Sequence, residues 1–589
     1  MSTVAQAPVE YVVDLADRNA HLCRVECKLE VDGDASTVAL HLPVWTPGSY
    51  LVREFARHLQ DVSCTDESGN VLPIAKTDKA TWTIQRGAAK KLTVRYRVYA
   101  HDLTVRAAHL DDSHAFWNGA AMFLYHQEHV GSAHRVRVVA PSDWHVTVGL
   151  PEVAPRVFEA KTYDELVDSP FEVGTHEVLS FQAVGKPHRL AIWGHVPMAR
   201  DKLTTDIPKI IATAAALFDG TVPYDDYTFI LLSSPGGYGG LEHRKSSTLL
   251  TSPFAFSPRK KYEEFLELVA HEFFHLWNVK RIHPTALGPF DYQREAYTRS
   301  LWVMEGITSY YDRLLLVRAG LKKPRAYLKT IADELGKIAE IPGRLRQSLE
   351  EASFDAWIKF YRPDENSSNS SISYYLKGGI VAMLLDLAIR TRSEGVRSLD
   401  DVMRLLWRRH GARDVGFRDE DVQSLFEEGA GCSLDDLFAR HVRGREELDP
   451  EKALRAFGLA VSRTHGEDPA PWLGVTTRDS GDSAIVSATM SGGPGEAAGL
   501  YAGDELVAID GFRVESGTLR SRLRDHHVGD TIELTVFRRD QLRTLELELG
   551  EKPASTYEIE PAKDATAAEG AAFERWLGAP LSSIQSEDE

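Results

Sequence analysis

YEEFLELVAHEFFH, residues 262–275, has apolar residues at helical spacing and ends in the pattern His-Glu-x-x-His. Residues four apart lie on one face of a helix, so His271 and His275 are predicted to bind one metal ion together. Glu272 is then placed to take a proton from a metal-bound water. The stretch therefore predicts a helix that carries a hydrolytic zinc site.

A catalytic zinc ion also needs a third protein ligand, which is expected from elsewhere in the chain. Glu305 is the best candidate, because it lies in the otherwise apolar run LWVMEGIT, residues 301–308. A lone carboxylate in such surroundings is costly unless it is paired or binds a metal. Asp312, two turns further along on the same face, is a candidate to contact a metal ligand. The competing interpretation places Glu305 on the surface near the start of a helix.

Composition narrows the class of protein. The chain has 589 residues with 43% hydrophobic and 26% charged residues, which is typical of a globular protein with several domains. A net charge of -18 argues against a general nucleic-acid binder. The four cysteines show no CxxC spacing and are read as free thiols in a reducing compartment. We see no signal peptide and no apolar run that spans a bilayer, so we expect a cytoplasmic protein without a membrane partner.

The pattern of elements along the chain predicts a multidomain α+β fold. Alternating strand patterns and turn signals come first, helical periodicity dominates the middle, and a compact strand-rich module follows a polar linker. The last stretch is rich in Ala, Glu and Asp and is expected to be partly disordered, with only the segment 573–577 able to dock. The predicted boundaries are an all-β domain at 1–182, a mixed and then helical domain at 183–462, the strand-rich module at 463–552 and the tail at 553–589.

Motifs around the predicted metal site carry a resemblance to known proteins. HEFFHLW, residues 271–277, followed by WVMEGITSYY, residues 302–311, resembles the gluzincin metallopeptidases, in which a Glu on a second helix completes the site. Four further segments are similar to the PDZ-containing glycyl aminopeptidases: VWTPGSYLVREFARH at 44–58, GGLEH at 239–243, HLWNVKRIHP at 275–284 and SYYLKGG at 373–379. The resemblance covers nearly the whole chain. It implies a thermolysin-like (gluzincin) catalytic domain with a large helical part between the β domain and a PDZ domain.

The same resemblance implies additional functional residues. Glu242 matches the acid that binds the free α-ammonium of an aminopeptidase substrate. His243 stands where the better-known GAMEN form of this motif has Asn, and its role stays open. Tyr375 matches the phenol that stabilises the oxyanion of the tetrahedral intermediate, and the neighbouring Tyr374 is its competitor. One zinc ion per chain and peptides with a free N-terminus, preferably Gly or Ala, are the implied cofactor and substrates.

The strand-rich module resembles a PDZ domain. Its first loop, Leu473-Gly474-Val475, is expected to offer backbone N–H groups to a peptide C-terminus, and a helix over 517–524 is expected to form the other wall of the groove. Two alternatives to an aminopeptidase remain open at this point. One is an endopeptidase that captures protein C-termini with its PDZ domain, and the other is a degenerate enzyme that serves as a PDZ scaffold.

Overall fold

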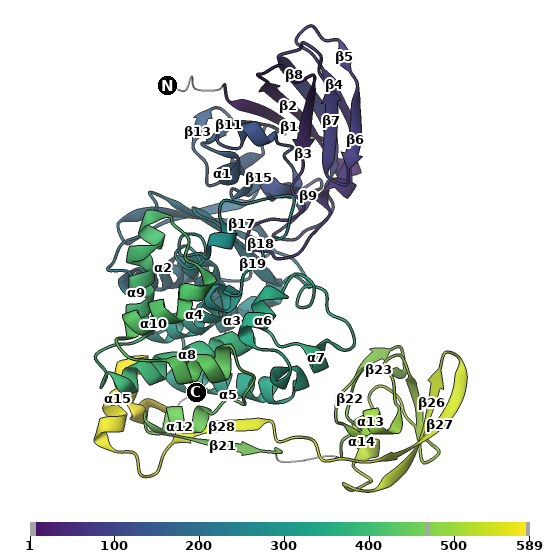
Figure 1. The fold of residues 1–589 in the computed structure, drawn as a ribbon, viewed down its shortest axis with the longest axis vertical. Coiled ribbons are helices and arrows are strands. Elements are labelled where there is room, and N and C mark those ends of the chain that lie inside the picture. The colour runs from purple at the N-terminus through teal and green to yellow at the C-terminus, as the bar shows by residue number, and fades with distance from the viewer. Residues whose placement is uncertain (1–6, 467–470, 585–589) are drawn as a thin grey trace. The chain divides into compact units, whose positions relative to one another are not determined.

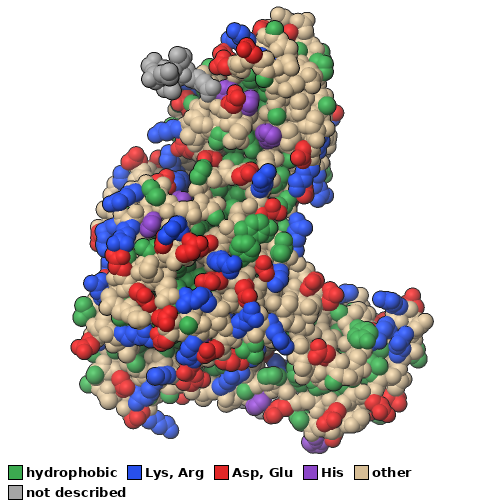
Figure 2. All heavy atoms as spheres, in the orientation of Figure 1, with side chains coloured by type: hydrophobic (Ala, Val, Ile, Leu, Met, Phe, Trp, Pro, Cys, Tyr) green, Lys and Arg blue, Asp and Glu red, His purple; other side chains and the backbone are tan. Residues whose placement is uncertain are grey.

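The computed structural model describes residues 7–466 and 471–584, and its ribbon is drawn in Figure 1. Two compact units are found. The first contains residues up to 298 together with 311–321 and 404–418, and the second contains the other residues. Across the described residues, no helix combines the length and the apolar character that crossing a membrane requires. Acidic and basic side chains are interspersed on the face that Figure 2 shows.

The N-terminal region consists of three sheets. The alternation in sequence predicts its strands well: β8 buries every second residue, as a sheet with one solvated face requires. The eight-stranded sheet has the order β13 (Glu152–Ala154), β14 (Val157–Ala160), β11 (His134–Val139), β1 (Val9–Asp17), β2 (Leu22–Glu30), β8 (Lys91–Tyr99), β4 (Leu59–Thr65), β5 (Val71–Leu72). The smaller sheets are β3 (Thr37–His41), β7 (Thr81–Gln85), β6 (Ile74–Asp78), and β12 (His145–Thr147), β15 (Phe171–Gly174), β10 (His114–Trp117), β9 (Ala108–Leu110).

A five-stranded mixed sheet supports the HExxH helix. Its central strand β18 is buried along its whole length, which explains the continuous apolar run YTFILL in the sequence. The order is β16 (Glu177–Ala183), β17 (Lys186–Gly194), β18 (Tyr227–Ser233), β20 (Ser246–Thr251), β19 (Gly239–Glu242). The strands β17, β18 and β20 are parallel, whereas β19 runs antiparallel at the edge. The edge strand β19 carries Glu242.

Helices dominate residues 259–457, as the periodicity predicts. The helices before the PDZ module are α1 (Tyr163–Val167), α2 (Arg200–Leu217), α3 (Arg259–Phe274), α4 (Ile307–Arg318), α5 (Pro324–Ala339), α6 (Leu349–Phe354), α7 (Ser367–Ser370), α8 (Leu376–Arg392), α9 (Leu399–Arg409), α10 (Val422–Ala430), α11 (Asp435–Leu437) and α12 (Pro450–Arg455). The apolar run that begins at residue 301 starts with a π-helical turn at Trp302–Gly306, after which α4 begins. The polar stretch at 364–371 contains the short helix α7.

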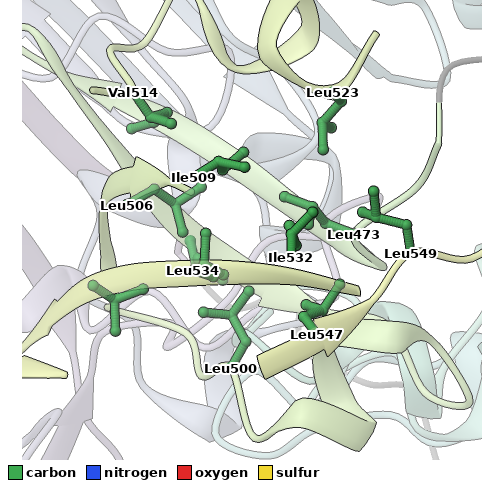
Figure 3. Packing of buried hydrophobic residues seen from close by; sticks show 13 residues of the cluster. Leu473, Leu500, Leu506, Ile509, Val514, Leu523, Ile532, Leu534, Leu547 and Leu549 are labelled. Atoms are coloured by element: carbon green, nitrogen blue, oxygen red, sulfur yellow. The ribbon is translucent and has the colours of Figure 1, made fainter. Parts of the chain in front are cut away.

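The PDZ module has its own core of aliphatic side chains, shown in Figure 3. Its elements are β22 (Val475–Ser480), β23 (Ser483–Thr489), α13 (Pro494–Ala498), β24 (Glu505–Ile509), β25 (Phe512–Arg513), α14 (Leu519–Leu523), β26 (Thr531–Arg538) and β27 (Gln541–Glu548). One edge strand of its sheet is β22, which follows Leu473 and Gly474. Leu473 itself points into the core with Leu523, so only the backbone of this residue is available to a ligand. The helix α14 is shorter than the helix expected over residues 517–524.

The C-terminal stretch differs from the expected partly disordered tail. The strand β28 (Thr556–Pro561) pairs with β21 (Leu459–Thr464), and α15 (Ala567–Leu577) begins with a capping box at Thr566 and Glu569. Trp576 is buried and its indole N–H donates to the Tyr310 hydroxyl at 3.0 Å. The segment 573–577 docks as expected, and the residues before it also form regular structure, in β28 and in the first part of α15. Residues 467–470 of the predicted linker and 585–589 of the tail lie outside the described residues.

Candidate active site

The helix α3 places both motif histidines at its C-terminal end. His271 lies in the last turn, and His275 follows Phe274 as the residue that ends the helix, with its N–H donating to the His271 carbonyl at 3.2 Å. The aromatic residues between and after them fix this end: Phe274 stacks on Tyr311 with ring centroids 4.8 Å apart, and Phe273 contacts Trp277. The local sequence thus folds so that the apolar residues anchor the turn that presents the imidazoles.

His271, His275 and Glu305 form a group that fits a zinc ion. Each offers one ligand atom, and these atoms all lie within 4.8 Å of one another. The Nδ1 atom of His271 lies 3.0 Å from the Asp312 carboxylate, and that of His275 lies 2.7 Å from the Asn278 carbonyl. These contacts occupy Nδ1 and orient Nε2 of each ring toward a metal. Two imidazoles and one carboxylate are the donor set of catalytic zinc sites such as those of thermolysin type.

Glu305 and Tyr375 are held by a close approach of two glycines. Glu305 is 2% exposed and lies in the π-helical turn, a conformation that recurs at functional sites. A Cβ added to the next residue, Gly306, would lie 2.7 Å from the backbone of Gly378. A Cβ added to Gly378 would likewise lie 2.9 Å from the Cα atom of Gly306. The motifs WVMEG and YLKG therefore pack backbone against backbone, which explains the glycine in each.

The two neighbouring tyrosines differ in their surroundings. Tyr374 is fully buried, whereas Tyr375 is only partly buried at the start of α8. The Tyr375 hydroxyl lies 3.2 Å from the Tyr361 hydroxyl, and its ring stacks on Phe360. Burial, and then the negative charge of Glu305, raises the pKa of Tyr375 well above its usual value. Tyr375 is thus held as a neutral phenol, and of the two tyrosines it is the one with an accessible side chain.

Glu242 and Glu272 lie close together beside His275. One ligand atom from each of these three residues lies within 4.8 Å of the others, and the two acids are 3% and 5% exposed. The Oε1 atom of Glu242 is buried and has no hydrogen-bond partner among the described residues. Glu242 also lines a cavity of ≈ 560 Å³ together with Trp45, Tyr50, Asp168 and Phe290. A buried carboxylate that lines a cavity is suited to bind a cationic group.

Two glycines make room for these acids. A Cβ on Gly240 would lie 2.1 Å from Oε1 of Glu272, and a Cβ on Gly48 would lie 2.5 Å from Oε1 of Glu242. Gly48 also has a positive φ of 87°, which L side chains rarely adopt. The segment VWTPGSY, residues 44–50, therefore contacts the acid of the GLEH motif.

His243 belongs to a buried polar network that sequence reasoning missed. Its Nδ1 lies 3.3 Å from Asp168, which also accepts from Lys280 at 2.6 Å and from the backbone N–H of Arg244 at 2.7 Å. Burial raises the pKa of Asp168, but the charge of Lys280 and the His243 hydrogen bond outweigh it, so this pKa lies well below its usual range. The network fixes the chain directly after Glu242. Lys280 lies in the matched segment HLWNVKRIHP, whereas Asp168 has no sequence signal of its own.

A second missed contact reaches β19 from the N-terminal region. The guanidinium of Arg106 donates to the Gly240 carbonyl at 3.0 Å. Val105 and Phe116 pack with Leu241 and Leu250 in one buried cluster. The loop and strand around residues 105–116 therefore position the edge strand that carries Glu242.

Comparison with known proteins agrees with this geometry. A family model described as M61 glycyl aminopeptidase matches residues 264–381, and one described as the peptidase M61 N-terminal domain matches residues 10–175. An aminopeptidase N family protein from Idiomarina loihiensis, of known crystal structure, is 33% identical and covers 97% of this chain and 100% of its own, with a TM-score of 0.90. The chain belongs to the M61 glycyl aminopeptidase family. It is therefore a metallopeptidase, and its residues 471–549 match a PDZ domain.

More distant similarities add no further function to this family assignment. An M1 zinc metallopeptidase from Deinococcus radiodurans is 14% identical over 76% of this chain and 95% of that chain, with a TM-score of 0.49. A probable periplasmic serine endoprotease DegP-like from Rhizobium meliloti (strain 1021) is 34% identical over 120 residues. That match covers 18% of this chain and only 24% of the relative.

Replacing Asp312 by Asn is expected to weaken metal binding. The amide keeps the size of the side chain but no longer offers a charged acceptor to Nδ1 of His271. Loss of such a contact costs about 10- to 100-fold in metal affinity or activity. Competition with a chromophoric chelator measures the affinity. Metal affinity equal to that of the wild-type protein contradicts the role of Asp312.

Replacing Gly240 by Ala is expected to reduce activity while the protein stays folded. The new methyl group forces the Glu272 carboxylate to move, and a misplacement of about 1 Å costs roughly 10²-fold in rate. The measurement is kcat on an aminoacyl anilide, with metal content and the melting temperature as checks. Gly131→Ala is the matched control, because a Cβ there meets nothing within 4 Å. Equal activity of both variants refutes the steric argument.

Proposed function

We propose that this chain is a zinc aminopeptidase that removes N-terminal residues, preferably Gly and Ala, from peptides. The observation that carries the proposal is the buried carboxylate of Glu242, grouped with Glu272 and His275 within 4.8 Å. An endopeptidase needs an open cleft on both sides of the scissile bond. A carboxylate beside the catalytic acid instead closes one side and attracts a free α-ammonium.

The catalytic roles follow from the chemistry of each side chain. His271, His275 and Glu305 would hold one zinc ion, which supplies a Lewis acid that polarises the scissile carbonyl and lowers the pKa of water. The Glu272 carboxylate accepts a proton from the attacking water and passes it to the leaving amine. Asp312 and the Asn278 carbonyl hold the two imidazoles in the required tautomer.

Two further side chains act on the substrate. Glu242 binds the N-terminal ammonium and thereby fixes how far the peptide enters. The neutral hydroxyl of Tyr375 donates to the oxygen that becomes negative in the transition state. One such donor is worth roughly 2.7–4 kcal/mol in other oxyanion sites. The preference for Gly and Ala is supported by family membership rather than by a pocket in this chain.

The PDZ domain is proposed to bind a peptide C-terminus. Its edge strand β22 is largely exposed, which is the condition for a peptide to add as a further strand. Leu519 of α14 is partly buried and packs against the PDZ core, so it is placed to supply the facing wall. Gly474 has a positive φ of 72°, which turns the backbone of the first loop at the end of the groove.

Replacing Glu272 by Gln is expected to lower kcat by about 10²- to 10⁴-fold with the metal retained, because the amide cannot accept the proton. Hydrolysis of glycyl-, alanyl- and leucyl-anilides, with metal content measured on the same samples, checks this. Activity that survives in the variant refutes the assigned base. No hydrolysis by the wild-type protein with bound zinc supports the scaffold alternative instead.

Replacing Glu242 by Gln is expected to lower kcat/KM for glycyl-anilide by about 10²-fold or more, since loss of one partner of a buried ion pair costs about 2–5 kcal/mol. The N-acetylated substrate, which lacks the ammonium, should be poor for wild-type protein and unaffected by the change. Glu263→Gln, on the same helix as Glu272 but paired with Arg259, is the control for loss of one charge. Rapid cleavage of N-acetylated peptides by the wild-type protein points to the endopeptidase.

A further inference from the structure

A hairpin in the N-terminal region brings together three metal-binding side chains that the reaction above does not use. His109 lies in β9, His114 begins β10, and Asp111 lies in the turn between these paired strands. Both strands belong to the four-stranded sheet, whose β9 and β15 are labelled in Figure 1. Each of the three residues offers one ligand atom, and these atoms all lie within 4.8 Å of one another. The group thus has two imidazoles and one carboxylate.

His114 is oriented as a metal ligand is. Its Nδ1 lies 2.9 Å from Oε1 of Glu172, and the side chains of both residues are completely buried. The ring stacks on Trp193 with centroids 3.7 Å apart. Its other nitrogen, Nε2, is buried and has no hydrogen-bond partner among the described residues. A carboxylate that holds Nδ1 so that Nε2 faces a metal is the usual arrangement around protein-bound metal ions.

The turn orients the other two groups. Oδ2 of Asp111 lies 3.1 Å from Nε2 of His109, close to the separation of about 3.3 Å between neighbouring ligands of tetrahedral zinc. Oδ1 of Asp111 accepts from Ser113 and from the backbone N–H of His114. The unpartnered buried Nε2 of His114 is costly, and a cation bound between these side chains would offset that cost.

We propose that His109, Asp111 and His114 bind a second divalent metal ion, which is Zn²⁺ in the native protein. Imidazole nitrogens favour zinc over Mg²⁺ and Ca²⁺, which prefer oxygen ligands. Asp111 is partly exposed, so water has access to a fourth position. The ion would close the hairpin β9–β10 at its turn.

The hairpin has a structural task to which such an ion would contribute. Arg106, just before β9, donates to the Gly240 carbonyl, and Phe116 of β10 packs in the cluster that contains Leu241. A metal that fixes the turn therefore stiffens the elements that position the strand bearing Glu242. This site is structural, and the ion takes no part in bond breaking.

Metal stoichiometry of the full chain tests the proposal. The protein is stripped with a chelator, reloaded with Zn²⁺ alone, desalted and analysed by mass spectrometry for metal per chain. Wild-type protein is expected to hold about two zinc ions. His109→Gln should hold about one and melt at a lower temperature, whereas His145→Gln, an exposed histidine of the same sheet, should hold about two.

Three further variants complete the test and separate this site from the catalytic one. Asp111→Asn changes a partly exposed turn residue, so it keeps the test valid if His109→Gln does not fold, and it should also hold about one ion. His275→Gln should hold about one ion as well, at the hairpin, and the combined His109→Gln/His275→Gln variant none. One zinc per chain in the wild-type protein, unchanged by both hairpin substitutions, overturns the second site. No loss of metal in His275→Gln overturns the catalytic site alone.

Discussion

Burial of two carboxylates at one point is the constraint on which the rest of this active site depends. Glu242 and Glu272 are almost inaccessible to water, and both lie within 4.8 Å of a nitrogen of His275. Two unit charges at that separation repel by about 3 kcal/mol at an effective dielectric constant of 20. Cations beside the two acids would offset this repulsion. A divalent ion beside Glu272 and, as proposed, an ammonium beside Glu242 would both do so, which is why the geometry favours the proposed aminopeptidase.

Glycines then determine how near these groups come. At Gly48 and Gly240 the missing side chain is replaced by the carboxylate of a distant residue, and at Gly306 and Gly378 two backbones meet. In each case a single methyl group would occupy the space of the Glu242 or Glu272 carboxylate, or of the backbone beside Glu305. Charge explains why the acids need a cation, and close packing explains how the fold brings them to the same place.

The sequence predicts those parts of the site that depend on local spacing. The four-residue interval in HExxH fixes His271 and His275 on one helical face, and an acid in an apolar run singles out Glu305; the structure groups all three. Asp168, Arg106 and Gly48 act through tertiary contacts with residues more than 70 positions away, and no periodicity marks them. The tail was expected to be partly disordered because its composition is polar, yet Trp576 and a strand pairing with β21 order it. The roles of Glu242 and Tyr375 rest on the family resemblance and remain proposals.

One structural device occurs twice in the first unit. Asp312 holds Nδ1 of His271, and Glu172 holds Nδ1 of His114, in each case with the second nitrogen of the ring directed away from the acid. A buried imidazole that needs only a hydrogen bond is satisfied by one neutral partner, and a carboxylate there adds the cost of a buried charge. That cost is offset when a metal ion on the other nitrogen attracts the carboxylate through the ring. The arrangement at His114 is therefore better explained by a bound cation than by packing alone, as it is at His271.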